Sequence, residues 1–371
     1  MRGSESMTRL LKKSLPVVAA VLIFVIAYGV YFWKENPLSK ETIGIESPSP
    51  SKPDNVAVQG KKRATLIAVG DVMMHIGQIW SGYDAERKIF DYSGFFVEVR
   101  DIIARADLSM ANLETTLSGG EEIFSGYPRF NSPDEIADAL KEAGFDIIFT
   151  SNNHSLDRGE KGVLRTIRVL RERGLVPVGT NETKEDRENV FVREINGIKI
   201  AFLAYTYGTN GIPLPKDKPF LVNLIDYEIM LKDIKSAREK ADAVVVYLHF
   251  GQEYSRKPSQ DQRNLAQKLV LAGADLIVAS HPHVLQPGEW MEIEDPWGRL
   301  TKKYIAYSLG NFISAQNFPN TDEGVILKVT VEKDVNANLV SVVDIEEIPT
   351  WVYRYKEKGR MKYVVKLGKK P

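Results

Sequence analysis

The fold of this chain depends on the stretch Ala274-Asp-Leu-Ile-Val-Ala-Ser-His281-Pro-His283-Val284. Its apolar, β-branched run lies between a glycine and a proline, a pattern typical of a buried strand in a parallel sheet. Two histidines separated by one proline follow the run. In open α/β sheets, ligand-binding and catalytic groups lie beyond the carboxyl ends of the strands. The stretch therefore predicts a buried strand with a functional site at its end.

Four other apolar runs, at residues 64–69, 108–112, 145–150 and 243–248, also stop at chemically active side chains. The chain has five histidines, and all five follow runs of this kind. A histidine that served packing alone would have no reason to prefer strand ends. We therefore expect the side chains at these ends to share one site. They are Asp71, Glu114, Asn153, His154, His249, His281 and His283.

Carboxylates, an amide and imidazoles form a ligand set that suits divalent Zn, Mn, Fe or Mg, and the chain has no cysteine to supply a thiolate. Such a set can hold two ions, which clamp the attacking and leaving oxygens of a hydrolytic displacement. A neighbouring histidine can protonate the leaving group. Taken singly, His249 could be a packed core residue, Asn153 a turn residue and Asp71 a helix cap. Their joint placement favours a shared metal site.

The N-terminal region predicts a membrane anchor. Residues 1–13 are basic, and the uncharged apolar stretch within 14–34 is long enough to cross a bilayer as a helix. The positive flank is expected to stay in the cytoplasm, which places the rest of a single-pass protein outside the cell membrane. A cleaved signal peptide is the alternative, but the apolar run is longer than usual for one. Residues 35–62 are polar and rich in Pro and Ser, so we expect a flexible linker.

Residues 63–350 are expected to form one α/β domain. Strands alternate with helices at 95–106, 132–144 and 162–173, which indicates βαβ units. Asn196-Gly197 predicts the turn of a β-hairpin. Helices at 226–240 and 259–272 follow, and the chain is mostly β after His283. The pattern predicts a two-sheet sandwich flanked by helices.

The C-terminal segment 351–371 is basic. From Arg354 onward it carries eight basic residues and one acidic residue, with tyrosines interleaved. A solvated, partly disordered tail is one interpretation, and contact with an anionic polymer or an anionic membrane surface is another. The whole chain has 49 basic and 49 acidic residues, which argues against a nucleic-acid-binding protein.

Six motifs occur in a fixed order between residues 65 and 317. They are Gly70-Asp71-Val-Met-Met, Asn112-Leu-Glu114, Ser151-Asn-Asn153-His154, His249-Phe-Gly251, Ser280-His281-Pro-His283-Val284 and Ser308-Leu-Gly310-Asn-Phe312. The set resembles the CapA family of bacterial capsule-synthesis proteins linked to poly-γ-glutamate. The resemblance implies a four-layered α/β/β/α sandwich like that of calcineurin-like metallophosphoesterases. It also implies a membrane complex that polymerises and exports the polymer, with other membrane subunits as partners.

By this resemblance, His154 matches a catalytic histidine, and six residues match metal-binding positions: Asp71, Glu114, Asn153, His249, His281 and His283. Two positions depart from typical metallophosphoesterases. Met73 stands where an Asp-x-His motif has its histidine, and Glu114 stands where a bridging aspartate is usual. Methionine is a poor ligand for a hard divalent ion, so one ion is expected to bind weakly unless His75 replaces the missing ligand.

These patterns leave several functions open. The first is a membrane-anchored protein of poly-γ-glutamate synthesis or export in which a metal-activated water attacks a phosphoester or amide bond. The second is a non-catalytic, metal-binding scaffold subunit of the polymer machinery. The third is a secreted metallophosphodiesterase unrelated to capsule. The missing histidine of Asp-x-His favours the scaffold, whereas His154 favours an enzyme, because a structural metal site does not need it.

Overall fold

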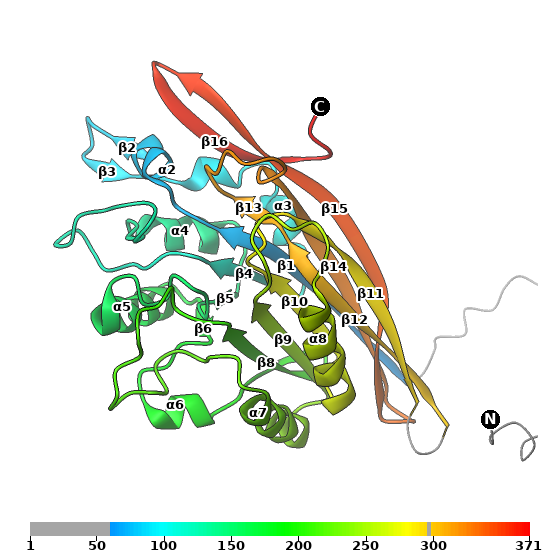
Figure 1. Ribbon diagram of the computed structural model, residues 1–371. Coiled ribbons are helices and arrows are strands. Elements are labelled where there is room, and N and C mark those ends of the chain that lie inside the picture. Colours follow the sequence, from blue (N-terminus) through cyan, green and yellow to red (C-terminus); the bar gives the residue numbers. More distant parts are fainter. Residues whose placement is uncertain (1–59, 295–297) are drawn as a thin grey trace, which may run out of the picture. The chain divides into compact units, whose positions relative to one another are not determined.

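The computed structural model describes residues 60–294 and 298–371, which belong to one compact unit (Figure 1). Two β-sheets dominate this unit. In spatial order, sheet 1 contains β16 (Arg360–Leu367), β15 (Leu339–Glu357), β14 (Glu323–Asp334), β1 (Lys61–Val72), β4 (Leu108–Leu113), β5 (Ile147–Phe149) and β6 (Val176–Val178), and β13 (Asn311–Ile313) also pairs with β1. Sheet 2 contains β11 (Leu285–Glu294), β12 (Leu300–Leu309), β10 (Leu276–Ser280), β9 (Ala243–His249), β8 (Ile198–Thr206) and β7 (Phe191–Ile195).

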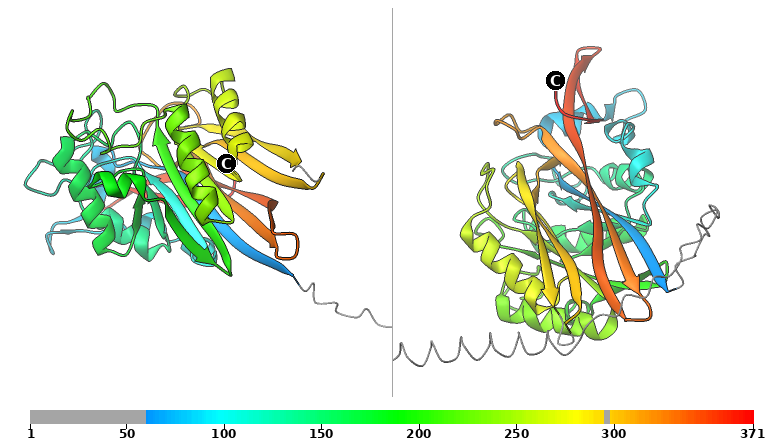
Figure 2. Two further views of the ribbon diagram at one scale, coloured as in Figure 1. Left: turned by 90° about the horizontal axis from the view of Figure 1, so that it is seen from below. Right: turned by 90° about the vertical axis from the view of Figure 1, so that its right-hand side faces the viewer.

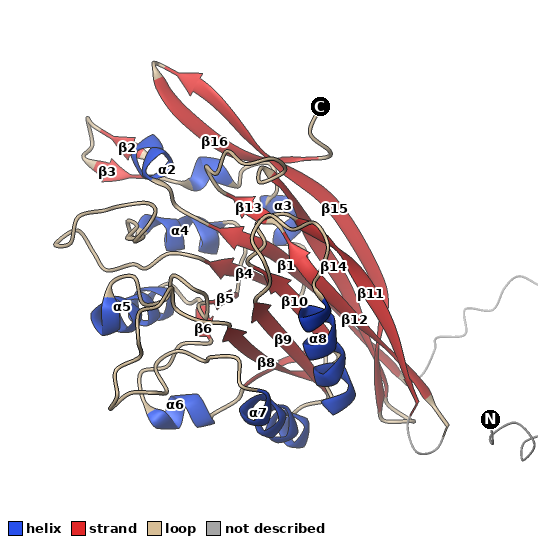
Figure 3. Ribbon diagram, in the orientation of Figure 1, coloured by secondary structure: helices blue, strands red, loops and turns tan. Residues whose placement is uncertain are grey.

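The helices are short and connect the strands, as Figure 3 shows. They are α2 (Ile76–Ser81), the 3₁₀-helix η1 (Ser93–Phe95), α3 (Arg100–Ile103), α4 (Glu135–Glu142), α5 (Gly159–Glu172), α6 (Lys184–Glu188), α7 (Tyr227–Lys240) and α8 (Gln260–Ala272). A two-stranded hairpin, β2 (Tyr83–Asp84) and β3 (Ile89–Phe90), lies beside α2 in Figure 1. Ser259 is the N-cap of helix α8, and its side chain accepts a hydrogen bond from the Gln262 N–H in a capping box.

Figure 2 shows the sheets and the helices outside them. Three apolar cores hold these layers together. The core between the sheets includes Leu66 of β1 and Val245 of β9. A second core packs α4 against the outer face of sheet 1, and a third packs α7 and α8 against the outer face of sheet 2. Each large side chain that is fully buried in these cores contributes about 1.5–3 kcal/mol. The prediction of a mixed α/β fold with two sheets between helices is confirmed.

The parallel strands of both sheets have their carboxyl ends in one region of the protein. β1 runs parallel to β4, β4 to β5, and β9 to β10. Their register places Asp71 opposite Asn112, and Ser280 opposite His249. Within each sheet, the last residues of these neighbouring strands are therefore level with one another. This alignment positions the site described below.

The predicted hairpin is present in β7 and β8, which pair antiparallel. Its turn residues Asn196 and Gly197 have φ angles of 51° and 76°. Two consecutive positive φ values are what a type I′ turn requires, and asparagine and glycine tolerate them best. The local sequence therefore predicts this part of the fold without tertiary information.

Three sequence-based expectations need correction. The helix expected at 95–106 is broken into η1 and α3. The domain begins before residue 63, because β1 starts at Lys61, where Lys61 and Arg63 both form ion pairs with Glu332 across the sheet. The segment 351–371 is not a disordered tail. It forms the end of β15 and β16, and its apolar face, including Val365, packs into the core of sheet 1.

The predicted anchor at 14–34 and most of the linker at 35–62 lie outside the described residues. Within the described ranges, no helix has the length and apolar character needed to span a bilayer.

Gly70 is where the backbone of β1 passes closest to the start of β13. A Cβ at Gly70 would lie 1.9 Å from the Gly310 carbonyl oxygen, while the next residue, Asp71, donates its N–H to that same oxygen at 3.0 Å. Gly70→Ala is expected to lower the free energy of unfolding by about 1–3 kcal/mol, the usual cost of overpacking. Urea unfolding of the full chain followed by circular dichroism measures the change.

Gly94→Ala is the matched control, because nothing lies within 4 Å of a Cβ there. Its unfolding curve should stay close to that of the parent chain. Equal destabilisation by both substitutions would contradict the close-approach argument.

Candidate metal centre

The ends of β1, β4, β9 and β10 bring five ionisable side chains together in the interior. They form two overlapping groups of potential metal ligands: Asp71, Glu114 and His249 in one, and Glu114, His281 and His283 in the other. Within each group the ligand atoms lie within 4.8 Å of one another, and all five side chains are buried. Glu114 belongs to both groups.

The contacts within the cluster are direct. Asp71 Oδ2 lies 3.0 Å from His283 Nδ1, across a sequence separation of 212 positions. Glu114 Oε1 lies 3.7 Å from His249 Nε2 and 3.8 Å from His283 Nε2. Residues from distant parts of the chain thus surround one small space.

Asn153 joins this cluster from the loop after β5. Its Oδ1 atom lies 2.7 Å from His249 Nε2. The other ring nitrogen of His249, Nδ1, lies 3.0 Å from the hydroxyl of Tyr247, which sits on the same face of β9. A partner on the second nitrogen fixes the ring plane of a ligating histidine. The side chain of His249 is therefore oriented from both sides.

Two asparagines hold Asp71 in place. Asn112 Nδ2 donates to Asp71 Oδ1 at 2.8 Å. Asn152 Nδ2 in turn donates to Asn112 Oδ1 at 3.1 Å and to the Leu113 carbonyl at 2.8 Å. Outer partners of this kind set the direction of a metal ligand and usually affect metal affinity by about 10–100-fold. This chain of hydrogen bonds links the ends of β1, β4 and β5.

Burial and charge set the protonation of the cluster. Burial, followed by the charge of Asp71, raises the pKa of Glu114 well above its ordinary value. Burial lowers the pKa of His249 well below its ordinary value and that of His281 to about 3. Burial also opposes ionisation of Asp71, but the hydrogen bond and charge of His283 outweigh it and lower the pKa of Asp71. Neutral imidazoles are the form that binds a metal ion.

The polar atoms of the cluster are incompletely satisfied by the described residues. Both carboxylate oxygens of Glu114, which is 0% exposed, lack a hydrogen-bond partner there, and so does Nδ1 of His281. A buried polar group without a partner costs about 1–3 kcal/mol, and more when it is charged. A cation between these atoms would supply the missing interactions, and oxygen and imidazole donors suit a divalent ion. The residues therefore fit a metal ion.

The backbone around the two histidines of the 274–284 stretch is strained. His281 and His283 have φ angles of 101° and 58°, in the region that L-residues rarely adopt. Such conformations persist only where the surrounding structure fixes them, and they cluster at functional sites. Both rings lie beside Glu114, and His283 also contacts Asp71.

His154 lies next to the cluster, directly after Asn153 in the chain. Its Nδ1 atom is 2.7 Å from Asp157 Oδ2, which also accepts the Phe130 N–H at 2.7 Å. The Phe130 ring packs edge-on against the imidazole. Asn210 Nδ2 lies 3.5 Å from the other ring nitrogen, Nε2. The Asp157 carboxylate accepts the hydrogen on Nδ1, and Nε2 has no carboxylate partner among the described residues.

The structure does not bring His75 into either ligand group, so it does not replace the missing histidine. His75 precedes α2, and its Nδ1 lies 3.3 Å from Gln78 Oε1 and 3.4 Å from the Ala315 nitrogen. Met73, which occupies the position of that histidine, is 2% exposed, and its sulfur lies 3.8 Å from the Ser314 hydroxyl. A packed thioether thus stands where a ligand is expected.

Sequence reasoning missed several residues that support the cluster. Asp157 could have been found from its spacing, since it follows His154 by three positions. Asn112 and Asn152 lie within the quoted motifs, but the sequence analysis assigned neither of them a role in the site. Asn210 and Tyr247 carried no sequence signal, because only the folded chain brings them to the site.

Comparison with known proteins identifies relatives over most of this region. The family described as "Bacterial capsule synthesis protein PGA_cap" matches residues 65–316. The chain is 32% identical over 278 residues to "Capsule biosynthesis protein CapA" of Bacillus anthracis, covering 72% of this chain and 64% of that protein. It is 30% identical over 286 residues to "PGA biosynthesis protein CapA" of Bacillus subtilis (strain 168), covering 75% and 71%. The match thus spans less than two thirds of the Bacillus anthracis protein.

Among solved structures, the chain is similar to a novel phosphatase from Mycoplasma pneumoniae, with 19% identity and a TM-score of 0.42 over 77% of this chain and 93% of that one. It is also similar to a 5′-nucleotidase precursor from Thermus thermophilus, with 16% identity and a TM-score of 0.43 over 77% and 54%.

Substitutions at the bridging carboxylate and behind it should separate ligands from their supports. We expect Glu114→Gln to weaken divalent metal binding by more than about 100-fold, because the bridging charge is lost. Asn112→Ala should weaken it by about 10–100-fold, the range typical of outer partners. Isothermal titration calorimetry of the full chain with Mn²⁺ and Zn²⁺ measures both effects.

Glu253→Gln is the control, since Glu253 is an exposed carboxylate on the nearby loop after β9. Its affinity for metal should match that of the parent chain. A loss as large as that of Glu114→Gln would mean that binding reflects general negative charge and not the buried cluster.

Proposed function

Because the chain belongs to the PGA_cap family of bacterial capsule synthesis proteins, we propose that it serves poly-γ-glutamate synthesis or export with a metal-dependent, phosphoesterase-like hydrolytic site. The observation that carries the hydrolytic part is the buried cluster around Glu114, whose carboxylate oxygens have no hydrogen-bond partner in the described part of the chain. Family membership supports the role in capsule synthesis, and the buried cluster supports the proposed hydrolytic chemistry.

The proposed location is the outer side of the cell membrane. The apolar stretch within residues 14–34 and the basic residues before it support a single-pass anchor with the folded domain outside. Other membrane subunits of the polymer machinery are the proposed partners. The anchor would hold the cluster close to a polymer that emerges from such a complex.

The two-sheet architecture supports a metallophosphoesterase-like arrangement. Strand ends from both sheets face one region, and loops after the strands can supply ligands from many parts of the chain. Here the ligands come from β9 and from the ends of β1, β4, β5 and β10. The proposed four-layered α/β/β/α sandwich is thus a scaffold for the cluster.

The two ligand groups would hold two ions, with Glu114 available to both and Asn153 as an added ligand beside His249. The oxygen and imidazole donors suit Mn, Fe or Zn. A bound divalent ion supplies Lewis acidity, which polarises a phosphoryl or carbonyl oxygen. Burial of the donors excludes bulk water from their ligand atoms.

His154 is proposed to transfer a proton to the leaving group through Nε2. Asp157 and Phe130 fix the orientation of its ring, and the contact of Asp157 with Nδ1 leaves Nε2 as the exchanging atom. The reaction class is hydrolysis of a phosphoester or an amide bond. If Asp157 only oriented a structural histidine, the His154 ring would not need to lie beside the ligand cluster.

A second candidate function, a metal-binding scaffold without turnover, is favoured by one observation. Met73 fills the position of a ligating histidine and is buried against Ser314. An ion at the Asp71 side would therefore lack one nitrogen ligand. In this alternative the cluster would stabilise the protein or bind polymer carboxylates through the metal.

Replacing the proposed acid should lower the rate of turnover without loss of metal. We expect His154→Ala to reduce hydrolysis of poly-γ-glutamate or of a phosphodiester by about 100-fold or more, because general acid catalysis typically contributes roughly 10²–10⁴-fold. Metal content, measured by inductively coupled plasma mass spectrometry of the full chain, should not change. Asp157→Asn is the companion variant and should retain metal with an intermediate rate.

Unaltered turnover in His154→Ala would remove the acid role. Stoichiometric metal with no turnover by the parent chain on either substrate would support the scaffold. Turnover of the phosphodiester with no effect of the chain on polymer production would favour a secreted phosphodiesterase that is unrelated to capsule.

Restoring the missing ligand tests the role of Met73. Met73→His recreates the Asp-x-His sequence, and we expect it to raise the affinity of the weaker ion by about tenfold or more, because imidazole is a better ligand than a thioether. Metal titration resolves the two binding steps. Met74→His is a control at the neighbouring buried position, and equal gains from both variants would contradict the assignment.

A further inference from the structure

Asn311 is a buried asparagine at the edge of the metal centre. It belongs to the Ser308-Leu-Gly310-Asn-Phe312 motif, where the chain leaves β12 of sheet 2 and enters β13 of sheet 1. Asn311 is 0% exposed. None of the six predicted metal ligands comes from this motif. A polar side chain that is fully buried at such a place needs a partner.

Asn311 lies next to Asp71 in sheet 1. β13 runs parallel to β1, and their register pairs Asn311 with Asp71, while β4 pairs Asn112 with Asp71 on the other side. Neighbouring strands are about 4.8 Å apart, and paired residues present their side chains to the same face. The next residue, Phe312, packs in the outer core of sheet 1, so Asn311 faces inward. Asn112 reaches Asp71 from one side, and Asn311 lies on the other.

Asn311 is also close to His283 of the second ligand group. The antiparallel ladder of β11 and β12 pairs Leu285 with Leu309. His283 lies two residues before Leu285, and Asn311 lies two residues after Leu309, so both lie just beyond the same end of this ladder. His283 Nδ1 contacts Asp71 Oδ2 at 3.0 Å. These three side chains are therefore neighbours where the chain crosses from sheet 2 to sheet 1.

The hydrogen bonds of the Asn311 amide show which of its two polar atoms is free. Nδ2 donates to the Thr321 carbonyl oxygen at 2.8 Å and to Gln316 Oε1 at 2.9 Å. A backbone carbonyl only accepts hydrogen bonds, so the atom that contacts Thr321 is the nitrogen. The free atom is Oδ1, which is buried and has no hydrogen-bond partner among the described residues.

An acceptor without a donor is unusual in a protein interior. A buried polar group that lacks its partner costs about 1–3 kcal/mol. Glu114, which shares a ligand group with Asp71, has two more carboxylate oxygens without a partner in the described ranges. Acceptor atoms that gather without donors form a binding place for a cation, and amide and carboxylate oxygens are the ligands that hard divalent ions prefer.

The Asp71 side of the cluster is also the side that lacks a ligand. Met73 stands where a histidine is expected, and its sulfur packs against the Ser314 hydroxyl at 3.8 Å. The Met73 N–H donates to the Ile313 carbonyl at 2.9 Å. The segment that begins with Asn311 therefore runs alongside the position of the lost ligand.

We propose that Asn311 Oδ1 is a ligand of the ion on the Asp71 side and supplies the interaction that is lost at Met73. With Asp71 and Glu114 this ion has three oxygen ligands, so it belongs to the hard divalent class, of which Mn²⁺ is the probe used below. The other ligand group contains two imidazoles and suits Zn²⁺ or Fe²⁺. The inference rests on the metal-binding part of the proposed function and adds one ligand and one ion class to it.

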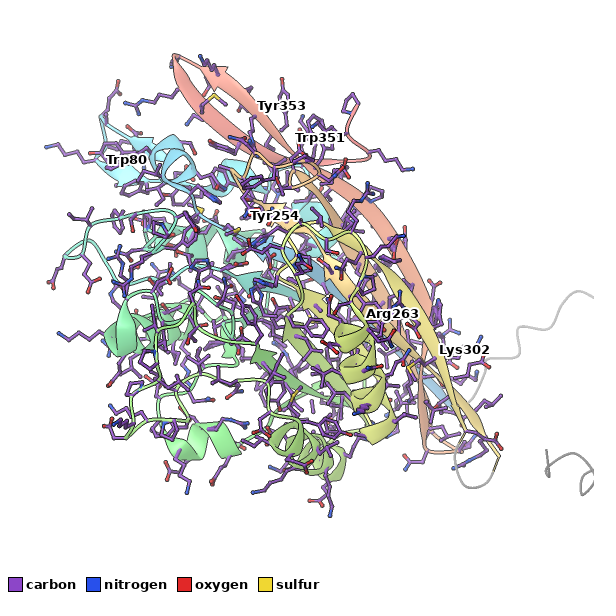
Figure 4. All side chains as sticks on the ribbon, in the orientation of Figure 1. Trp80, Tyr254, Arg263, Lys302, Trp351 and Tyr353 are labelled. Atoms are coloured by element: carbon purple, nitrogen blue, oxygen red, sulfur yellow. The ribbon has the colours of Figure 1, made fainter. Side chains whose placement is uncertain are left out.

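A purely structural role is the competing explanation, because Nδ2 of Asn311 ties down the loop 314–322. Phe318 of this loop lies 4.6 Å from the Tyr254 ring, and Tyr254 lies 6.2 Å from the His283 ring. Figure 4 shows Tyr254 close to the ends of the strands. Loss of the Nδ2 hydrogen bonds would disturb this loop, so the test has to separate the two atoms of the amide.

The test measures Mn²⁺ binding to the metal-free full chain by isothermal titration calorimetry and by electron paramagnetic resonance of free Mn²⁺. Asn311→Ala removes both polar atoms and should weaken one binding step by about tenfold or more. Asn311→Asp keeps a ligand oxygen and loses the two amide hydrogens, and it should bind Mn²⁺ at least as tightly as the parent chain. If Asn311 only tied down the loop, both variants would lose affinity equally, and that result would overturn the proposal.

Gln316→Ala is the matched control, because it removes one partner of Nδ2 and leaves Oδ1 in place. Its affinity for Mn²⁺ should stay within about twofold of the parent value. A loss as large as that of Asn311→Ala would assign the effect to the loop and overturn the proposal. Thermal unfolding of the metal-free proteins checks that each variant is folded, and Asn311→Asp decides the outcome if Asn311→Ala is not.

A rescue experiment identifies the ion. Met73→His added to Asn311→Ala should restore the binding step that Asn311→Ala weakened, because both positions serve the same ion. Recovery confined to the other step would overturn the proposal. Since imidazole is a softer ligand than an amide oxygen, the double variant should gain more affinity for Zn²⁺ than for Mn²⁺, and equal gains would contradict the hard-ion class.

Activity measurements separate this inference from the hydrolytic function. Weaker Mn²⁺ binding by Asn311→Ala, in a chain whose parent hydrolyses neither poly-γ-glutamate nor a phosphodiester, would sustain the ligand and reject the hydrolytic function. Unchanged Mn²⁺ binding by Asn311→Ala, in a chain whose parent hydrolyses either substrate, would reject the ligand and leave the hydrolytic function intact. In that case a buried water is the partner of Oδ1.

Discussion

The carboxylate of Glu114 is buried in the interior, and no group in the described part of the chain donates a hydrogen bond to it. An isolated buried carboxylate is strongly disfavoured, and it either takes up a proton or acquires a compensating positive charge. His249 and His281 do not supply that charge, because burial lowers the pKa of both side chains far enough to keep them neutral near pH 7. A divalent cation meets the requirement, and the arrangement of the surrounding strands is best understood as a means of holding it.

Much of the local structure follows from positioning that cation. The Asn152–Asn112–Asp71 hydrogen bonds tie three strand ends together, and Tyr247 fixes the ring of His249. The left-handed backbone conformations of His281 and His283 cost free energy, and they persist because the rest of the domain fixes them. The apolar cores of both sheets provide that support, since close-packed interiors keep strand ends at fixed separations. Rigid elements below the cluster make a precise set of ligands possible.

The periodicity of the sequence predicted the strands and the location of the site well. Apolar runs at 64–69, 145–150 and 243–248 correspond to β1, β5 and β9, because strands that are buried on both faces are continuously apolar. The prediction was wrong for 351–371, where lysines alternating with tyrosines and valines suggested a solvated tail. Those lysines face outward, while Tyr363 and Val365 pack inward. The prediction gave more weight to the high content of charged residues than to the alternation of polar and apolar residues. His75 followed a strand like the other histidines, but helix α2 directs it to Gln78.

The sequence by itself determined the α/β class, the Asn196-Gly197 turn and the set of strand-end residues, because each depends on neighbours in the chain and on hydrophobic periodicity. Only the tertiary structure decided which of those residues meet. The pairing of Asp71 with His283 and the contact of Glu114 with His249 depend on strand register, packing between sheets and backbone strain. Long-range packing fixes these distances, and no local pattern encodes them.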